Sequence, residues 1–178
     1  MTKEKNKWYM VTLVGKDKAS IVSHVTAALY DGGGNLGETS MMRLGGNFTI
    51  MMMVEFSGSI KDLHDVFSSV TDSMDLHLHI DHIDAKLHEH RIPDVRISVY
   101  GADRAGIVST VTGVLAEAGL NILDLESDVA GDINKPLYIM HIEGEASEGV
   151  KALASALQII KDENGIDAEL VEIDTMIG

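Results

Sequence analysis

The sequence has no cysteine and only two prolines among its 178 residues. Without cysteine it can form no disulfide, offers no thiolate nucleophile and cannot build a zinc site from Cys ligands. No stretch approaches the roughly 20 apolar residues that a membrane-spanning helix needs. The polar segment over residues 1–7 lacks the apolar core of a secretory signal. We therefore expect a cytoplasmic protein that does not associate with membranes.

Aromatic and basic residues are also scarce. Aromatics make up 4% of the chain, and 14 Lys and Arg stand against 28 Asp and Glu, for a net charge of -14. Residues 1–83 contribute -3 of this charge and residues 84–178 contribute -11. Binding to phosphate chains needs Lys and Arg, and an RNA-binding sheet needs exposed stacking aromatics, so we expect no direct contact with nucleic acid. The acidic field either keeps the protein soluble or attracts a basic protein partner.

The dominant feature of the sequence is an internal repeat. Residues 15–26 align without a gap on residues 101–112, and the match continues with Asn35 on Asn121. A repeat of this length predicts two copies of one domain. Residues 86–93 are polar, lack periodicity and end in a proline, as linkers do. We predict a first domain at residues 1–84, a linker at 85–93 and a second domain at 94–178.

Each repeat alternates segments of strand-like and helix-like character. The order βαββαβ, twice, predicts an α+β fold of two tandem ferredoxin-like domains. In the first repeat we expect strands at 8–14, from 35, at 48–56 and at 76–80, and helices over 21–29 and 60–70. In the second repeat we expect strands at 95–100, from 121, at 137–142 and at 166–173, and helices over 107–115 and 150–160.

One motif begins both repeats, at Gly15 and at Gly101: Gly-x-Asp-[Lys/Arg]-x-x-Ile-Val, a helix, then Gly-x-Asn-[Leu/Ile]-x-[Glu/Asp]. It resembles the ACT domain, a βαββαβ module that senses small molecules, usually amino acids. Two such domains in one chain, with residues 35–40 and the hairpin at 44–53, are similar to the glycine cleavage system transcriptional repressor family. This resemblance implies a non-enzymatic, homodimeric regulator that binds glycine or a serine-like amino acid. It also implies control of a DNA-binding protein through protein contact.

The turn between the first strand and the first helix of each repeat is the candidate ligand site. A helix N-terminus offers free N–H groups and positive potential to a carboxylate. Asp17 and Asp103 could pair with an ammonium group, and Asn35 and Asn121 carry both a donor and an acceptor. The alternative is structural, because Asp is a common helix cap and Asn after a glycine is common in turns.

The two repeats differ inside this turn. Gly106 matches the turn glycine of the family, whereas the first repeat has Ser20 there. Ser20 could cap the helix or narrow access to the first site, so the two halves need not bind the same ligand. The candidate ligand-binding residues are Asp17, Ser20, Asn35, Asp103, Gly106 and Asn121.

Two polar clusters do not favour a metal site. His77, His79 and Asp81 share the outer face of a strand whose Leu and Ile residues supply the buried face. Imidazoles can bind transition metals, but no histidine matches them in the second repeat, and a solvated or domain-facing strand is favoured. The acidic alternation over residues 124–128 lacks a compact ligand loop. It favours a solvated face or a surface for a basic partner.

Methionines gather on the hairpin of the first repeat. Alternation places Met51 and Met53 on the face opposite to Ile50, Met52 and Val54. A strand that is apolar on both faces is covered on both sides or offers an adaptable contact surface. Core and domain packing is the simpler interpretation, and a partner or dimer face is the alternative.

No catalytic constellation is found in the sequence. Ser23 and His24 are adjacent on a helix and do not face each other, and no Gly-rich loop matches a nucleotide-binding template. We expect no enzyme activity, no metal and no cofactor. The alternative to an amino-acid sensor is a structural oligomerisation module without a functional ligand site.

Overall fold

The computed structural model describes residues 7–84, 91–102, 105–132 and 135–173. The chain divides into two compact units, one with the described residues up to 84 and the other with those from 91 onward. We call them the first and second domain and describe each by itself. The predicted linker lies mostly outside the described residues, and its boundaries stay a prediction.

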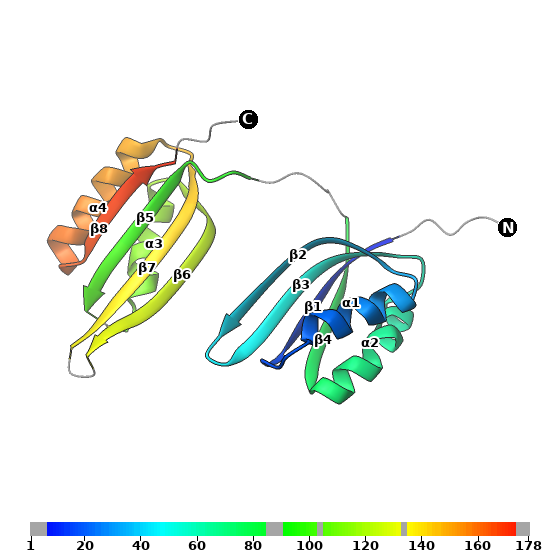
Figure 1. Ribbon diagram of the computed structural model, residues 1–178. Coiled ribbons are helices and arrows are strands. Elements are labelled where there is room, and N and C mark those ends of the chain that lie inside the picture. The colour runs from blue at the N-terminus through cyan, green and yellow to red at the C-terminus, as the bar shows by residue number, and fades with distance from the viewer. Residues whose placement is uncertain (1–6, 85–90, 103–104, 133–134, 174–178) are drawn as a thin grey trace. The chain divides into compact units, whose positions relative to one another are not determined.

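The first domain has the predicted βαββαβ order (Figure 1). Its strands form one antiparallel sheet in the order β2-β3-β1-β4. Both helices lie on one face of this sheet and pack against each other. The elements are β1 Lys7–Lys16, α1 Ile21–Asp31, β2 Asn35–Leu44, β3 Asn47–Phe56, α2 Ile60–Met74 and β4 Leu76–Ile83.

The second domain repeats this plan. Its antiparallel sheet has the order β6-β7-β5-β8, and its two helices pack together on one face. The predicted α+β fold of two ferredoxin-like domains is confirmed. The elements are β5 Val95–Ala102, α3 Ile107–Glu117, β6 Leu120–Asp132, β7 Lys135–Ala146, α4 Val150–Asn164 and β8 Asp167–Glu172.

Alternation along the strands and helical spacing along the helices produce a separate core in each domain. In β1 the buried side chains are Tyr9, Val11 and Leu13, at every second position. Facing them, α1 buries side chains at positions 21, 25 and 29, four residues apart, so that they share one stripe of the helix. The hydrophobic pattern of the sequence thus decides which face of each element is covered.

Most elements of the structure differ by a few residues from the sequence-based expectation, and β1 and α2 show two of the causes. β1 continues through Gly15 to Lys16 instead of stopping at the glycine. Gly15 is needed for close approach, because a Cβ there would lie 2.6 Å from the Leu76 side chain of β4. Helix α2 continues to Met74, beyond the predicted end at residue 70. Its last turn adds the half-buried Met74 to the edge of the core.

The face of the first sheet opposite the helices carries methionine and histidine side chains. In the first domain Met51 is 46% exposed while Met52 is fully buried, as the alternation predicts. His77 and His79 are also exposed, and His79 Nε2 lies 2.8 Å from Asp81 Oδ2. Within the described residues no group of three or more His, Asp or Glu is arranged to hold a metal ion.

No helix in the described ranges is long and apolar enough to cross a membrane.

Candidate ligand-binding site

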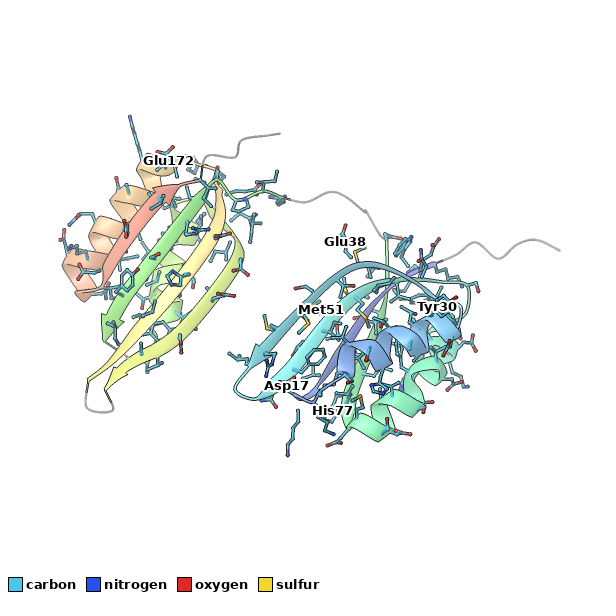
Figure 2. All side chains as sticks on the ribbon, in the orientation of Figure 1. Asp17, Tyr30, Glu38, Met51, His77 and Glu172 are labelled. Carbon is cyan, nitrogen blue, oxygen red and sulfur yellow. The ribbon has the colours of Figure 1, made fainter. Side chains whose placement is uncertain are left out.

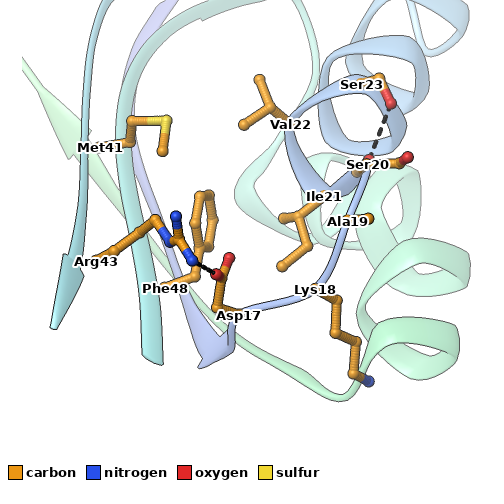
Figure 3. A pocket seen from close by; sticks show the side chains of 10 residues that line it. All are labelled: Asp17, Lys18, Ala19, Ser20, Ile21, Val22, Ser23, Met41, Arg43 and Phe48. Atoms are coloured by element: carbon orange, nitrogen blue, oxygen red, sulfur yellow. Dashed lines mark hydrogen bonds and ion pairs between the residues drawn. The ribbon is translucent and has the colours of Figure 1, made fainter. Parts of the chain in front are cut away.

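A pocket of about 730 Å³ opens beside the N-terminus of α1 in the first domain (Figure 3). It lies between the β1–α1 turn and the neighbouring ends of β2 and β3. The turn predicted as the ligand site therefore does border a cavity. The residues that line it are Asp17, Lys18, Ala19, Ser20, Ile21, Val22, Ser23, Met41, Arg43 and Phe48.

The mouth of this pocket carries an ion pair between Asp17 and Arg43 (Figure 3). Asp17 follows β1, whereas Arg43 comes from β2 and lies opposite Phe48 of β3. Phe48 in turn lies opposite Gly15, so the sheet brings Arg43 back to the end of β1. The Asp17 side chain is 23% exposed and that of Arg43 is 68% exposed. A carboxylate and a guanidinium are thus available at one opening.

The backbone turn at Ser20 begins helix α1. Ser20 has φ 69° and ψ 9°, a left-handed conformation that non-glycine residues rarely adopt. Its carbonyl accepts hydrogen bonds from Ser23 Oγ at 2.9 Å, His24 N at 3.1 Å and His24 Nδ1 at 2.7 Å. These three contacts hold the turn in place.

The structural alternative, that Asp17 or Ser20 caps α1, is not what the structure shows. Ser20 is at the N-cap position, but its hydroxyl makes no capping hydrogen bond. Asp17 lies three residues earlier and pairs with Arg43. The first-turn N–H groups of α1 therefore receive no hydrogen bond from the Ser20 side chain, and the residues that carry them, Ile21, Val22 and Ser23, line the pocket.

The rest of the pocket is mainly apolar. Ile21 and Phe48 are each 2% exposed and form its floor, and Val22 and Met41 flank them. Lys18 reaches the other way, donating a hydrogen bond of 2.7 Å to the carbonyl of Met74 at the end of α2. Arg43 is therefore the cation that faces Asp17.

Asn35 does not line this pocket. It begins β2 opposite Glu55, near one end of β3, whereas Asp17 follows Lys16, which lies opposite Asn47 at the other end. The eight steps from Asn47 to Glu55 correspond to roughly 26 Å at the usual rise of a strand. Within one domain, Asn35 therefore does not join Asp17 and Ser20.

In the second repeat the structure describes two of the three candidate residues, Gly106 and Asn121. Asp103 lies outside the described residues. Gly106 occupies the N-cap of α3 with φ 88°, the counterpart of Ser20. Asn121 Nδ2 donates to Glu145 Oε2 at 3.1 Å, and Arg91 donates to the same carboxylate at 2.8 Å. These hydrogen bonds, with that of Arg91 the larger cause, lower the pKa of Glu145.

Arg43 is the residue that the sequence analysis missed. The sequence does contain a signal for it, because the Gly45-Gly46 turn fixes the register of the hairpin. Counting back from that turn places Arg43 opposite Phe48. At the equivalent place in the second sheet Val129 lies opposite Tyr138.

The fold defines two tandem α+β domains of the ferredoxin-like class. An ACT domain model matches residues 8–81, and a second ACT domain model matches residues 95–163. The chain belongs to the ACT domain family, with one domain in each half.

Two curated relatives each correspond to one domain. A UPF0237 protein of Clostridium perfringens is 31% identical over 86 residues, covering 47% of this chain and 97% of the relative. A UPF0237 protein of Methanopyrus kandleri is 37% identical over 71 residues, covering 40% of this chain and 78% of the relative.

Two solved structures share the whole tandem architecture. A protein of Galdieria sulphuraria superimposes with a TM-score of 0.76 at 24% identity, over 95% of this chain and 99% of that one. A protein proposed to be a glycine cleavage system transcriptional repressor gives a TM-score of 0.68 at 17% identity, over 94% and 98%. At these identities the similarity establishes the fold.

Proposed function

We propose that this chain is a non-enzymatic regulatory protein that binds a small amino acid, glycine or serine-like, in the pocket of the first domain. The observation that carries the proposal is the Asp17–Arg43 pair at the mouth of the pocket. An amino acid at neutral pH carries one ammonium and one carboxylate, the two charges that this pair can bind. Charge-assisted hydrogen bonds of this kind are the stronger ones in proteins.

The binding mode follows from the placement of these groups. The ligand ammonium is held by Asp17, and its carboxylate by the Arg43 guanidinium, which can offer two parallel N–H donors. The uncapped first turn of α1 adds N–H groups and positive potential next to Ser20. Ile21 and Phe48 leave an apolar floor suited to a small side chain. The ligand would exchange the Asp17–Arg43 pair for one charged contact to each residue.

Regulation would operate through protein contact. A ligand changes the balance between two arrangements only by binding one of them more tightly. We propose a DNA-binding regulator as the partner, in keeping with the description of one structural neighbour, and a homodimer in the cytoplasm as the acting form. Carboxylates on β6 and β8, among them Asp124, Glu126 and Glu169, lie on the outer face of the second sheet, where Glu143 of β7 is paired with Arg96. This charge suits a basic partner surface.

Thermal unfolding against a panel of the twenty amino acids tests the proposal. A ligand that binds only the native state stabilises it by RT ln(1 + [L]/Kd), about 4 kcal/mol at 1,000 times Kd. A selective rise in the unfolding temperature with glycine or serine is the expected result. No rise with any amino acid would contradict amino-acid sensing.

A second candidate function, a structural oligomerisation module, is favoured by the outer face of the first sheet. Its centre carries no charge: Met51 lies opposite Thr12, Met53 opposite Met10, and Met42 opposite Thr49. Uncharged, methionine-rich centres are typical of protein interfaces. Four strands make a face about 33 Å long and 19 Å wide. The area of this face approaches the roughly 800 Å² that each partner buries in a standard interface.

A further inference from the structure

We infer that the first domain alone binds the amino acid, so that each chain takes up one ligand molecule, and that Arg43 is the residue that decides this. The inference rests on the proposed function and adds its stoichiometry and its specificity-determining residue. The two domains serve as a comparison within one molecule, because they share a fold, a register and most of the turn.

The correspondence between the domains is fixed by strand pairing. Gly15 lies opposite Phe48, which lies opposite Arg43 across the first sheet. In the second sheet Gly101 lies opposite Tyr138, which lies opposite Val129. Arg43 and Val129 therefore occupy the same place in the fold, at the edge strand beside the turn.

Most of the pocket lining is common to both domains. Ala19, Ile21, Val22 and Ser23 have identical counterparts at positions 105, 107, 108 and 109, and an aromatic ring occupies the Phe48 position in both. These residues pack the helix start against the sheet, which both domains require. Shared packing therefore does not distinguish a binding domain from a structural one.

The lining residues that differ change the chemistry of the pocket. Lys18, Ser20, Met41 and Arg43 of the first domain correspond to Arg104, Gly106, Ser127 and Val129 in the second. Of these changes only Arg43 to Val129 removes a charge. Val129 leaves the edge strand β6 without the guanidinium that Arg43 supplies on β2.

The electrostatic surroundings of Val129 also disfavour a carboxylate. Val129 is 51% exposed, and the carboxylate of the preceding Asp128 accepts a hydrogen bond of 2.7 Å from its backbone N–H. Residues 84–178 carry a charge of -11, against -3 for residues 1–83. An anionic group near β6 therefore meets a field of its own sign, whereas Arg43 offers it a cation.

Isothermal titration of the full-length protein with glycine, and separately with serine, measures the stoichiometry directly. We expect one site per chain. Two sites per chain would overturn this inference and leave the proposed function intact. The absence of binding by every amino acid in the thermal panel would overturn both.

Matched substitutions test the role of Arg43. Arg43→Val gives the first domain the residue of the second and should weaken binding at least tenfold. Arg43→Lys keeps the charge but loses the fork of parallel donors, so an intermediate affinity is expected. Val129→Ala, the matched control, should leave affinity and stoichiometry unchanged. Unaltered binding by a folded Arg43→Val protein would overturn the inference, and fluorescence of Trp8, the only tryptophan, verifies that its domain is folded.

Discussion

Arg43 on β2 forms an ion pair with Asp17, the first residue after β1, across the mouth of a pocket whose floor is apolar. The two side chains come from opposite sides of the pocket, Arg43 from the edge strand β2 (Figure 3) and Asp17 from the turn that leads into α1 (Figure 2). Because both are partly exposed, a ligand can reach them without opening the core.

Asp17→Asn should weaken amino-acid binding by roughly 10- to 100-fold, since a hydrogen bond to a charged group contributes about 1.5–3 kcal/mol. The stability of the free protein should change by less than about 1 kcal/mol, as expected of an exposed ion pair. Titration calorimetry and urea unfolding measure the two effects. Asp65→Asn breaks the exposed pair with Lys61 on α2 and is the matched control. Equal loss of affinity in both variants would contradict a direct role for Asp17.

Ser20→Gly should raise the stability of the first domain by about 1 kcal/mol. The left-handed conformation costs a non-glycine residue roughly 1–2 kcal/mol, part of which is offset by the greater chain entropy of glycine. Urea unfolding followed by Trp8 fluorescence reports on this domain. The reverse change, Gly106→Ser, should destabilise the second domain by a similar amount, because open space surrounds Gly106 and only its φ of +88° opposes a side chain. Hydrogen exchange of α3 measures it.

Ser59→Ala should lower the stability of the first domain by about 1 kcal/mol. Ser59 caps α2 through a capping box, in which its hydroxyl accepts from the Asp62 N–H and its own N–H donates to Asp62 Oδ2 at 2.8 Å. Trp8 fluorescence in urea again provides the measurement. Ser73→Ala, near the other end of the same helix, should have a smaller effect. A larger loss of stability in Ser73→Ala than in Ser59→Ala would show that the capping box contributes little to the stability of the domain.

The same capping box predicts a dependence on pH. The hydrogen bond from the Ser59 hydroxyl, followed by that from its backbone N–H, lowers the pKa of Asp62. A lowered pKa stabilises the native state fully above the unfolded pKa near 4, and this contribution is lost as the pH falls through the folded value. The difference in unfolding midpoint between the wild type and Asp62→Asn should therefore become smaller as the pH is lowered from about 6 to about 2. A difference in unfolding midpoint that does not change with pH would show that the charge of Asp62 does not cause it.

Met51→Glu should weaken self-association if the outer face of the first sheet is the dimer interface. A carboxylate at the centre of an uncharged contact would lie opposite its own copy or a nearby methionine. Sedimentation velocity over a range of concentrations measures the effect. His141→Glu, on the outer face of the second sheet beside Glu126, is the matched control and should not change association. A dimer that persists in Met51→Glu would exclude this face.

The internal repeat and the alternation of apolar residues were sufficient to predict both domains. Buried positions such as Val11 and Leu13 recur at every second residue, a pattern that only a half-covered strand produces. The ends of elements were predicted less accurately: Gly15 serves close packing against Leu76 and does not end its strand. A glycine pattern does not reveal which of these roles applies.

The candidate site was predicted in part. Asp17 and Ser20 do border a pocket, whereas Asn35 lies near the far end of the sheet. These residues belong to one motif along the chain, but the length of a ten-residue strand separates Asn35 from the other two in space. Arg43 was missed because it belongs to no motif and reaches the pocket only through the pairing of β2 with β3.

The sequence by itself determined the ACT architecture, because hydrophobic periodicity and turn glycines are local features that do not depend on which distant residues are in contact. It also determined the acidic charge and the absence of cysteine chemistry. Tertiary structure alone decided that Arg43 pairs with Asp17 and that Ser20 leaves α1 uncapped. Those outcomes depend on strand register and on backbone conformation, which place side chains from separate elements within reach of one another.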